Sequence, residues 1–71
     1  MKLQQVIYAV EVFRQRSYTK AAQVLYVSQP RLSRALKELE EELGFEIFQR
    51  TRHGIQGTTT RGYAFIKQSL E

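Results

Sequence analysis

Hydrophobic residues recur along the chain at spacings that predict helices. Near the N-terminus the apolar positions follow i, i+3, i+4, i+7 and i+10, which is the period of one face of an α-helix. These positions are Leu3, Val6, Ile7, Val10 and Phe13. The pattern therefore predicts an amphipathic first helix over about residues 2–16, with these side chains on its apolar face.

A second, shorter helix is predicted from Ser17 onward. The Ser17 hydroxyl can accept a hydrogen bond from a free N–H of the first turn. The helix would run through the sequence TKAAQVL, in which the small residues Ala21 and Ala22 allow another helix to approach closely. Residues 26–28 interrupt the pattern and predict a short turn.

The third predicted helix covers about residues 28–43 and has clear start and stop residues. Ser28 is placed to cap it, and Pro30 falls in its first turn, where a missing N–H costs no hydrogen bond. Gly44 lies where a left-handed residue usually ends a helix. At about 100° per residue, one arc of apolar side chains is expected to face the core: Leu32, Ala35, Leu36, Leu39 and Leu43.

The rest of the chain changes in character. The sequence FEIFQRTR is rich in β-formers, HG makes a turn and IQGTTT is rich in threonine, so residues 45–58 predict a two-stranded hairpin with a basic tip. Thr59 or Thr60 then caps a last helix through GYAFIKQSL. The whole order predicts a mainly α fold, with three helices, a hairpin and a final helix.

Size and composition narrow the class of protein. With 71 residues, of which 42% are apolar, the chain forms at most one small domain. It has no cysteine, so neither a disulfide nor a thiolate metal site can stabilise it. No apolar run is long enough to cross a membrane, and the N-terminus is too short and polar for a signal peptide. We therefore expect a cytoplasmic protein with no membrane partner.

Catalytic chemistry finds no support in the sequence. All seven carboxylates are glutamates, and there is no nucleophile–base pair or glycine-rich phosphate loop. His53 is the only histidine and has no acidic or cysteine partner near it in sequence. We expect no enzyme activity, no metal and no cofactor. At the hairpin tip, His53 would be either a donor near phosphate or a solvated loop residue.

Charge is distributed in three zones. Residues 1–36 carry a net charge of +5, residues 37–48 carry −4 with five glutamates, and residues 49–71 carry +3. Two basic zones on either side of an acidic belt suggest two separate contacts with a polyanion. A solvated charged face is the alternative explanation.

The third helix has the chemistry of a DNA-reading surface. A helix N-terminus attracts anions through its free N–H groups and positive dipole end. Side chains able to donate to phosphate or to base edges gather around it: Gln29, Arg31, Ser33, Arg34 and Lys37. The glutamates come later in the helix, where they would repel phosphate. Together with the second helix and the turn, this pattern predicts a helix–turn–helix whose recognition helix enters the major groove.

The sequence SYTKAAQVLYVSQPRLSRALKELEEELGFEIFQRT, residues 17–51, resembles the N-terminal DNA-binding domain of a LysR-type transcriptional regulator. The matching elements at fixed spacing are Ala21-Ala22, Leu25, Ser28-Gln29-Pro30, Leu32-Ser33, Leu39-Glu40, Leu43-Gly44 and Phe48-Gln49-Arg50. The resemblance implies a winged helix–turn–helix, with a three-helix core and a two-stranded β wing, that binds dyad-symmetric promoter DNA as a dimer or tetramer.

The resemblance also implies roles for individual residues. The third helix would lie in the major groove, Ser17 and Thr19 beside the DNA backbone, and the wing tip at residues 52–54 in the minor groove. With the helix chemistry above, the candidate DNA-binding residues are Ser17, Thr19, Ser28, Gln29, Pro30, Arg31, Ser33, Arg34, Lys37, Arg50, Arg52 and His53.

The last helix resembles the linker helix that pairs with a second subunit. We expect residues 1–58 to form the DNA-binding domain, residues 59–71 to start the linker helix, and a homodimer to form through Tyr63, Phe65, Ile66 and Leu70. Packing within one chain is the alternative. The C-terminal effector domain of such regulators, which would bind a small-molecule inducer, cannot be contained in 71 residues. The chain therefore looks like a fragment of a bacterial, nucleoid-associated regulator.

Two positions depart from the family pattern. A leucine-threonine pair usually follows the wing, with a glycine three residues after the threonine, whereas this chain has GTTTRG. Either Gly57 replaces the leucine and Gly62 comes one residue late, or Thr58 replaces the leucine in register. Position 31 is commonly small in the family, so Arg31 either determines specificity or contacts phosphate.

Other functions stay open at this point. Tyr8, Tyr18 and Tyr26 are expected to pack at the edge of the core rather than to stack on bases. A winged-helix module for protein–protein contact would leave the basic face solvated or bound to an acidic partner. RNA binding is weakly supported, since no aromatic-rich sheet is available to stack bases.

Overall fold

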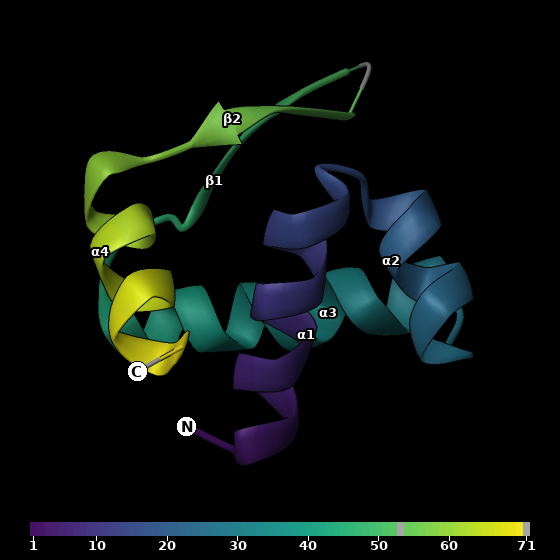
Figure 1. The fold of residues 1–71 in the computed structure, drawn as a ribbon, viewed down its shortest axis with the longest axis horizontal. Coiled ribbons are helices and arrows are strands. Elements are labelled where there is room, and N and C mark those ends of the chain that lie inside the picture. The colour runs from purple at the N-terminus through teal and green to yellow at the C-terminus, as the bar shows by residue number, and fades with distance from the viewer. Residues whose placement is uncertain (53, 71) are drawn as a thin grey trace.

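The computed structural model describes residues 1–52 and 54–70. Its elements are α1 (Leu3–Gln15), α2 (Tyr18–Leu25), α3 (Gln29–Leu43), β1 (Phe48–Thr51), β2 (Gly54–Thr58) and α4 (Thr60–Leu70). The first three helices form the body of the molecule, the antiparallel β1–β2 hairpin extends from it, and α4 lies beside α1 (Figure 1). The prediction of a mainly α, winged helix–turn–helix fold is confirmed.

Helix starts and ends follow the residues that the sequence offers for them. Ser17 caps α2 by accepting a hydrogen bond from the Lys20 N–H at 3.1 Å. Ser28 caps α3 in the same way, and Gly44 ends α3 in the left-handed conformation with φ of 81°. In the described part of the chain, none of the helices has the length and apolarity needed to cross a bilayer.

The core lies where α1, α2, α3, the start of β1 and one turn of α4 meet. Its largest fully buried side chains are Phe48, Leu32, Leu36, Leu39, Ile47, Ile66 and Val12. Within the predicted apolar arc of α3, Leu32, Leu36 and Leu39 are fully buried. Ala35 and Leu43 lie at the edge of the arc and are only partly buried against the core.

The first helix uses a different face from the one that its apolar spacing indicates. Its buried residues are Gln5, Tyr8, Ala9 and Val12, whereas Leu3 is 75% exposed and Ile7 is 49% exposed. Small Ala9 lets neighbouring helices come close. Gln5 can be buried because its side-chain oxygen accepts a hydrogen bond from the Lys2 N–H at 3.0 Å. The apolar stripe thus remains partly on the surface.

The tyrosine predictions are confirmed for two residues and wrong for the third. Tyr8 and Tyr18 are buried at the edge of the core. Tyr26 is 96% exposed. It is the left-handed residue that ends α2, with φ of 58°, and its backbone N–H bonds back to the Gln23 carbonyl. This backbone conformation carries the ring into solvent.

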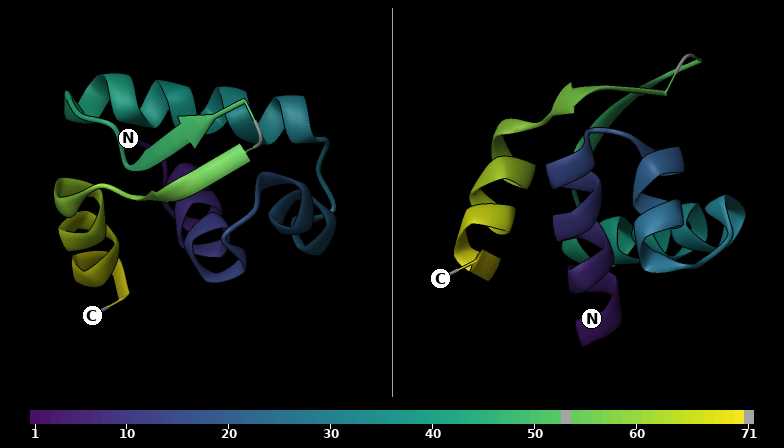
Figure 2. Two further views of the ribbon diagram at one scale, coloured as in Figure 1. Left: turned by 90° about the horizontal axis from the view of Figure 1, so that it is seen from above. Right: turned by 45° about the vertical axis from the view of Figure 1, so that its right-hand side comes forward.

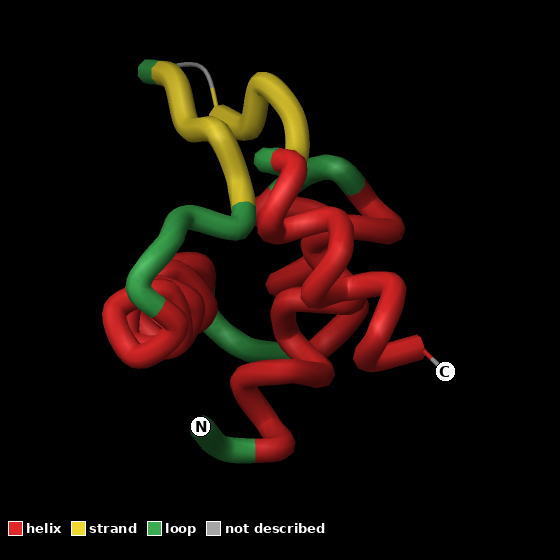
Figure 3. Tube along the Cα trace, turned by 90° about the vertical axis from the view of Figure 1, so that its left-hand side faces the viewer, coloured by secondary structure: helices red, strands yellow, loops and turns green. Residues whose placement is uncertain are grey.

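The wing is shorter than the predicted hairpin. β1 begins at Phe48, which pairs with Thr58, and the register is interrupted between Gln49 and Arg50. Residues 45–47 lie outside the strand, and the Ile47 N–H donates to the side chain of Glu40 at 2.6 Å rather than to β2. Figure 3 shows this connecting segment between the end of α3, seen end-on, and the hairpin.

The wing connects to α4 through Thr59. The Thr59 hydroxyl oxygen accepts a hydrogen bond from the Gly62 N–H at 2.9 Å, so Thr59 rather than Thr60 caps the start of the helix. A Cβ on Gly62 would lie 2.3 Å from the Ile47 carbonyl oxygen. A side chain at position 62 would therefore force the wing base and α4 apart.

The exposed surface of α4 is smaller than predicted. Ile66 is only 1% exposed and belongs to the core, so the prediction that it contacts a second subunit is wrong. Phe65 is half-buried, while Tyr63 is 53% exposed and Leu70 is 52% exposed. The aromatic rings of Phe13 and Tyr63 are 6.0 Å apart between centroids, which fixes α4 against α1.

Candidate nucleic-acid interface

The start of α3 lies on the surface beside the start of α2. Gln29, Pro30 and Arg31 are exposed. The Thr19 hydroxyl donates to the side-chain oxygen of Gln29 at 3.3 Å, which links the two helices of the helix–turn–helix. Since Ser17 and Ser28 cap their helices, their hydroxyls act first as structural acceptors.

A groove of about 800 Å³ lies between α3 and the wing. Gln29, Ser33 and Lys37 line it from α3, and Arg50 and Arg52 line it from the wing. Residues of the two elements can line one groove because the hairpin runs alongside α3, toward the half where the helix begins (Figure 2). The fold thus brings together donors that are 13 to 23 positions apart in the chain.

The remaining predicted residues of α3 lie outside this groove. Arg31 and Arg34 are exposed but do not line it, and neither does Pro30. Successive residues of a helix are about 100° apart, so Arg31 and Ser33 lie on opposite flanks of α3. The basic surface of α3 therefore extends around the helix from the groove to its outer side.

The groove also contains acidic groups near its other end. Glu40, Glu41 and Glu46 line it where α3 ends, opposite the Gln29 end. Positive charge is therefore concentrated toward the start of α3 and toward Arg52 near the wing tip. His53, a predicted tip residue, lies outside the described residues.

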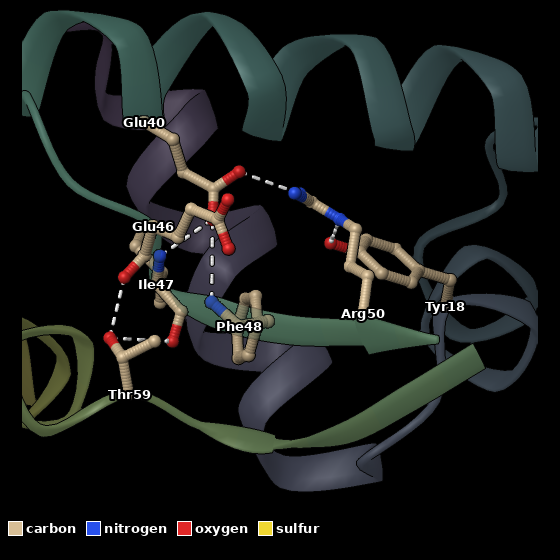
Figure 4. Close-up of polar contacts among 7 residues, drawn as sticks. All are labelled: Tyr18, Glu40, Glu46, Ile47, Phe48, Arg50 and Thr59. Carbon is tan, nitrogen blue, oxygen red and sulfur yellow. Dashed lines mark hydrogen bonds and ion pairs between the residues drawn. The ribbon is translucent and has the colours of Figure 1, made fainter. Parts of the chain in front are cut away.

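Glu40 is the centre of a hydrogen-bond network at the base of the wing (Figure 4). Its carboxylate accepts from the Ile47 N–H at 2.6 Å and from the Phe48 N–H at 3.3 Å. Its other oxygen accepts from Arg50 Nη2 at 2.6 Å, and Arg50 Nε donates to the Tyr18 hydroxyl oxygen at 2.8 Å. The network joins α3, β1 and α2.

Burial shapes the protonation of this network. Desolvation raises the pKa of Tyr18 above its ordinary value, although the nearby positive charge of Arg50 works against the shift. Burial also works to lower the pKa of Arg50, but the hydrogen bond to Glu40 and further interactions with Tyr18 and Glu40 outweigh it and raise that pKa. Arg50 is thus charged and Tyr18 neutral in the folded protein near neutral pH.

Arg50 is a predicted DNA-binding residue whose guanidinium is bound to other side chains of the protein. Two of its nitrogen atoms are engaged inside the protein, and its side chain is 37% exposed. The sequence predicts only that Glu40 repels phosphate, whereas its side chain is 7% exposed and forms part of the fold. Its position on α3, about 80° from Leu32 and next to the apolar arc, is the one signal that could have indicated burial.

The fold and this surface define a class of protein. A capped helix, a three-residue turn, an exposed polar helix start and a hairpin alongside that helix make a winged helix–turn–helix. Residues 3–62 match the family described as "Bacterial regulatory helix-turn-helix protein, lysR family". The chain belongs to this family.

Related proteins are transcriptional regulators by name. The chain is 42% identical over 71 residues to the regulator BudR of Klebsiella aerogenes, covering all of this chain and 49% of BudR. It is 42% identical over 72 residues to the regulator CysB of Haemophilus influenzae, covering all of this chain and 22% of CysB. The chain thus spans about half the length of one relative and about a fifth of the other.

Solved structures of the family superpose closely on this chain. The DNA complex of the CbnR DNA-binding domain gives a TM-score of 0.92 at 33% identity, over 99% of this chain and 79% of that chain. The complex of the BenM DNA-binding domain with catB site 1 DNA gives 0.91 at 38% identity, over 99% of this chain and 74% of that chain. Full-length BenM with the R156H mutation also gives 0.91 at 38% identity, over 99% of this chain but 23% of that chain.

Proposed function

We propose that the chain is the sequence-specific, double-stranded DNA-binding domain of a bacterial transcriptional regulator. The exposed first half of α3, residues 29–37, enters the major groove, and the wing tip near Arg52 reaches the minor groove. The observation that carries this proposal is the groove that brings Gln29, Ser33 and Lys37 opposite Arg52. The close fold match to two family domains solved as DNA complexes supports it.

Selection of bound sequences from a random duplex library tests the proposal. A dyad-related pair of enriched motifs is the expected result, because a dimer presents two α3 helices to the DNA. Binding to the enriched duplex should weaken steeply as salt rises, through release of counterions from the phosphates. A library that shows no enrichment, with equal affinity for all duplexes, would contradict sequence-specific binding.

We also propose that the domain forms a homodimer through α4 and the adjoining face of α1. Tyr63 and Leu70 are exposed on α4, and Leu3 and Ile7 are exposed on α1. The Phe13–Tyr63 ring contact holds these two helices together. The partner surface thus includes the apolar stripe of α1 that the core leaves uncovered, and it excludes Ile66.

Sedimentation of Leu70→Glu against the wild type tests the dimer. Leu70 is half-exposed, so a glutamate there can stay hydrated in the monomer but not in an apolar interface. The variant should remain folded, and at high concentration it should sediment with a lower average molecular mass than the wild type. The same mass for both proteins, whether monomer or dimer, would contradict an interface that contains Leu70. Ile66→Glu is unsuitable for this test, because it would place a charge in the core.

We further propose that this domain is part of a longer regulator. An effector domain beyond this segment would bind a small-molecule inducer and support a tetramer. The protein would act in the cytoplasm, on promoter DNA of the nucleoid. Its biochemical role in this proposal is binding rather than catalysis, in line with the names of its relatives.

A further inference from the structure

We propose that Glu40, Arg50 and Tyr18 form a positioning network that fixes the wing relative to α3, so that Glu40 strengthens DNA binding although it carries the same sign of charge as DNA. The inference rests on the proposed function, because its principal readout is DNA binding. None of the three residues has to contact DNA in this role.

The base of the wing is held by a side chain of α3 in addition to its pairing with β2. Ile47 and Phe48 are buried, and both of their N–H groups donate to the Glu40 carboxylate. Buried backbone donors require a partner. The partner is a residue of α3, so the start of β1 is fixed directly to the recognition helix, three residues beyond Lys37 in the chain.

Arg50 holds the wing at the point where the pairing of its two strands is interrupted. The register of the two strands is interrupted between Gln49 and Arg50. At this point the Arg50 guanidinium reaches back to α3 through Glu40 and to α2 through the Tyr18 hydroxyl. Beyond Arg50 the chain continues to Arg52 and the wing tip. The network therefore sets the direction in which the tip leaves the body of the molecule.

The network and simple electrostatics predict opposite effects of the same substitution. Glu40 lines the groove between α3 and the wing, together with Lys37 and Arg52. If Glu40 acted only through its charge, removing that charge would strengthen binding to a polyanion. If Glu40 positions the wing, removing its charge breaks the Arg50 ion pair and weakens binding.

The experiment compares Glu40→Gln with Glu41→Gln, which removes the same charge from an exposed neighbour that also lines the groove. Each variant is titrated with the selected duplex carrying A·T-rich or G·C-rich flanks, at one salt concentration and well below its unfolding temperature. We expect Glu40→Gln to bind about tenfold more weakly, the effect of one lost hydrogen bond to a charged group. It should also lose its preference between flanks while retaining the central base preferences. Glu41→Gln should bind as tightly as the wild type or more tightly.

Two results would overturn the proposal. One is binding of Glu40→Gln at wild-type strength or above, with the flank preference retained. The other is an equal loss of flank and central preferences, which would indicate general loss of structure. Tyr18→Phe is a second variant that keeps the ring in the core and removes only the hydroxyl. It should reduce the flank preference without changing the central one, and an unchanged flank preference would count against the network.

A wild-type protein without any sequence preference would instead contradict the proposed function. The network is then tested on the free protein, by hydrogen exchange of the Ile47 and Phe48 amides. These amides should exchange faster in Glu40→Gln than in Glu41→Gln. Equal exchange in the two variants would show that Glu40 does not hold the wing.

Discussion

The two halves of α3 carry opposite charges and are held in different ways. In the first half, Arg31 and Arg34 are exposed, and the serine cap is the chief local constraint on the helix start. In the second half, Glu40 is buried and accepts hydrogen bonds from the wing. Exposed charge is available to a partner molecule, whereas buried charge is used to build the fold. Within the acidic half, Glu40 therefore contributes to the fold, whereas Glu38, Glu41 and Glu42 remain exposed.

The largest effect should come from Glu40→Ala. This change leaves the buried Ile47 and Phe48 N–H groups without their carboxylate, and each unpaired buried group costs about 1–3 kcal/mol. The free energy of unfolding, measured in urea, should fall by about 2–4 kcal/mol. Glu41→Ala is the matched control and should stay within about 0.5 kcal/mol of the wild type. Equal losses in the two variants would remove the distinction between the halves of α3.

Arg34→Ala probes the first half of the helix. We expect its free energy of unfolding to stay within about 0.5 kcal/mol of the wild type, because the side chain is exposed. Its DNA affinity should fall, and if Arg34 reads a base, preference at one position should relax by about 1–3 kcal/mol. Titration with duplexes that differ at single positions measures this. Unchanged affinity for every duplex would remove Arg34 from the interface.

Arg52→Ala extends the comparison to the wing tip. Arginine is attracted to the narrow minor groove of A·T-rich DNA, so binding to A·T-rich flanks should weaken more than binding to G·C-rich flanks. We expect a difference of about 1 kcal/mol. Fluorescence anisotropy with the two duplexes measures it. An equal loss for both flanks would mean that Arg52 contacts phosphate without reading groove width.

The smallest effect concerns pH. Burial raises the pKa of Tyr18 above 10.0, so the folded state favours the neutral phenol. The resulting stability is fully present below the unfolded pKa and is lost as the pH rises through the folded pKa. The stability advantage of the wild type over Tyr18→Phe should therefore shrink as the pH rises above about 10. An advantage that is constant or grows over this range would contradict the neutral, buried hydroxyl.

Much of the fold was predictable because local signals specify it. Ser17 and Ser28 each bond to a backbone N–H within three residues, and Gly44 adopts a backbone conformation that few other residues tolerate. These effects depend only on near neighbours in the chain. The order of helices, the wing and the position of the exposed helix start followed from them.

The errors concern contacts between distant parts of the chain. Apolar spacing identified a stripe on α1 through Leu3 and Ile7, but tertiary packing buries the face with Ala9 and Val12. A second subunit covering the stripe would reconcile the two observations. Glu40 was missed for a similar reason, since its hydrogen-bond partners lie 7 to 10 residues away, at Ile47 and in β1.

The contact between Gly62 and the Ile47 carbonyl has a consequence for protein engineering. The first turn of α4 lies directly on the wing base and Ile66 completes the core, so α4 supplies part of the core that residues 1–58 need. A chimaera that joins this DNA-binding domain to a foreign dimerisation helix should keep the native sequence through Ile66 and place the junction after that residue. A junction at the end of the wing would expose the core and release the hairpin from its support.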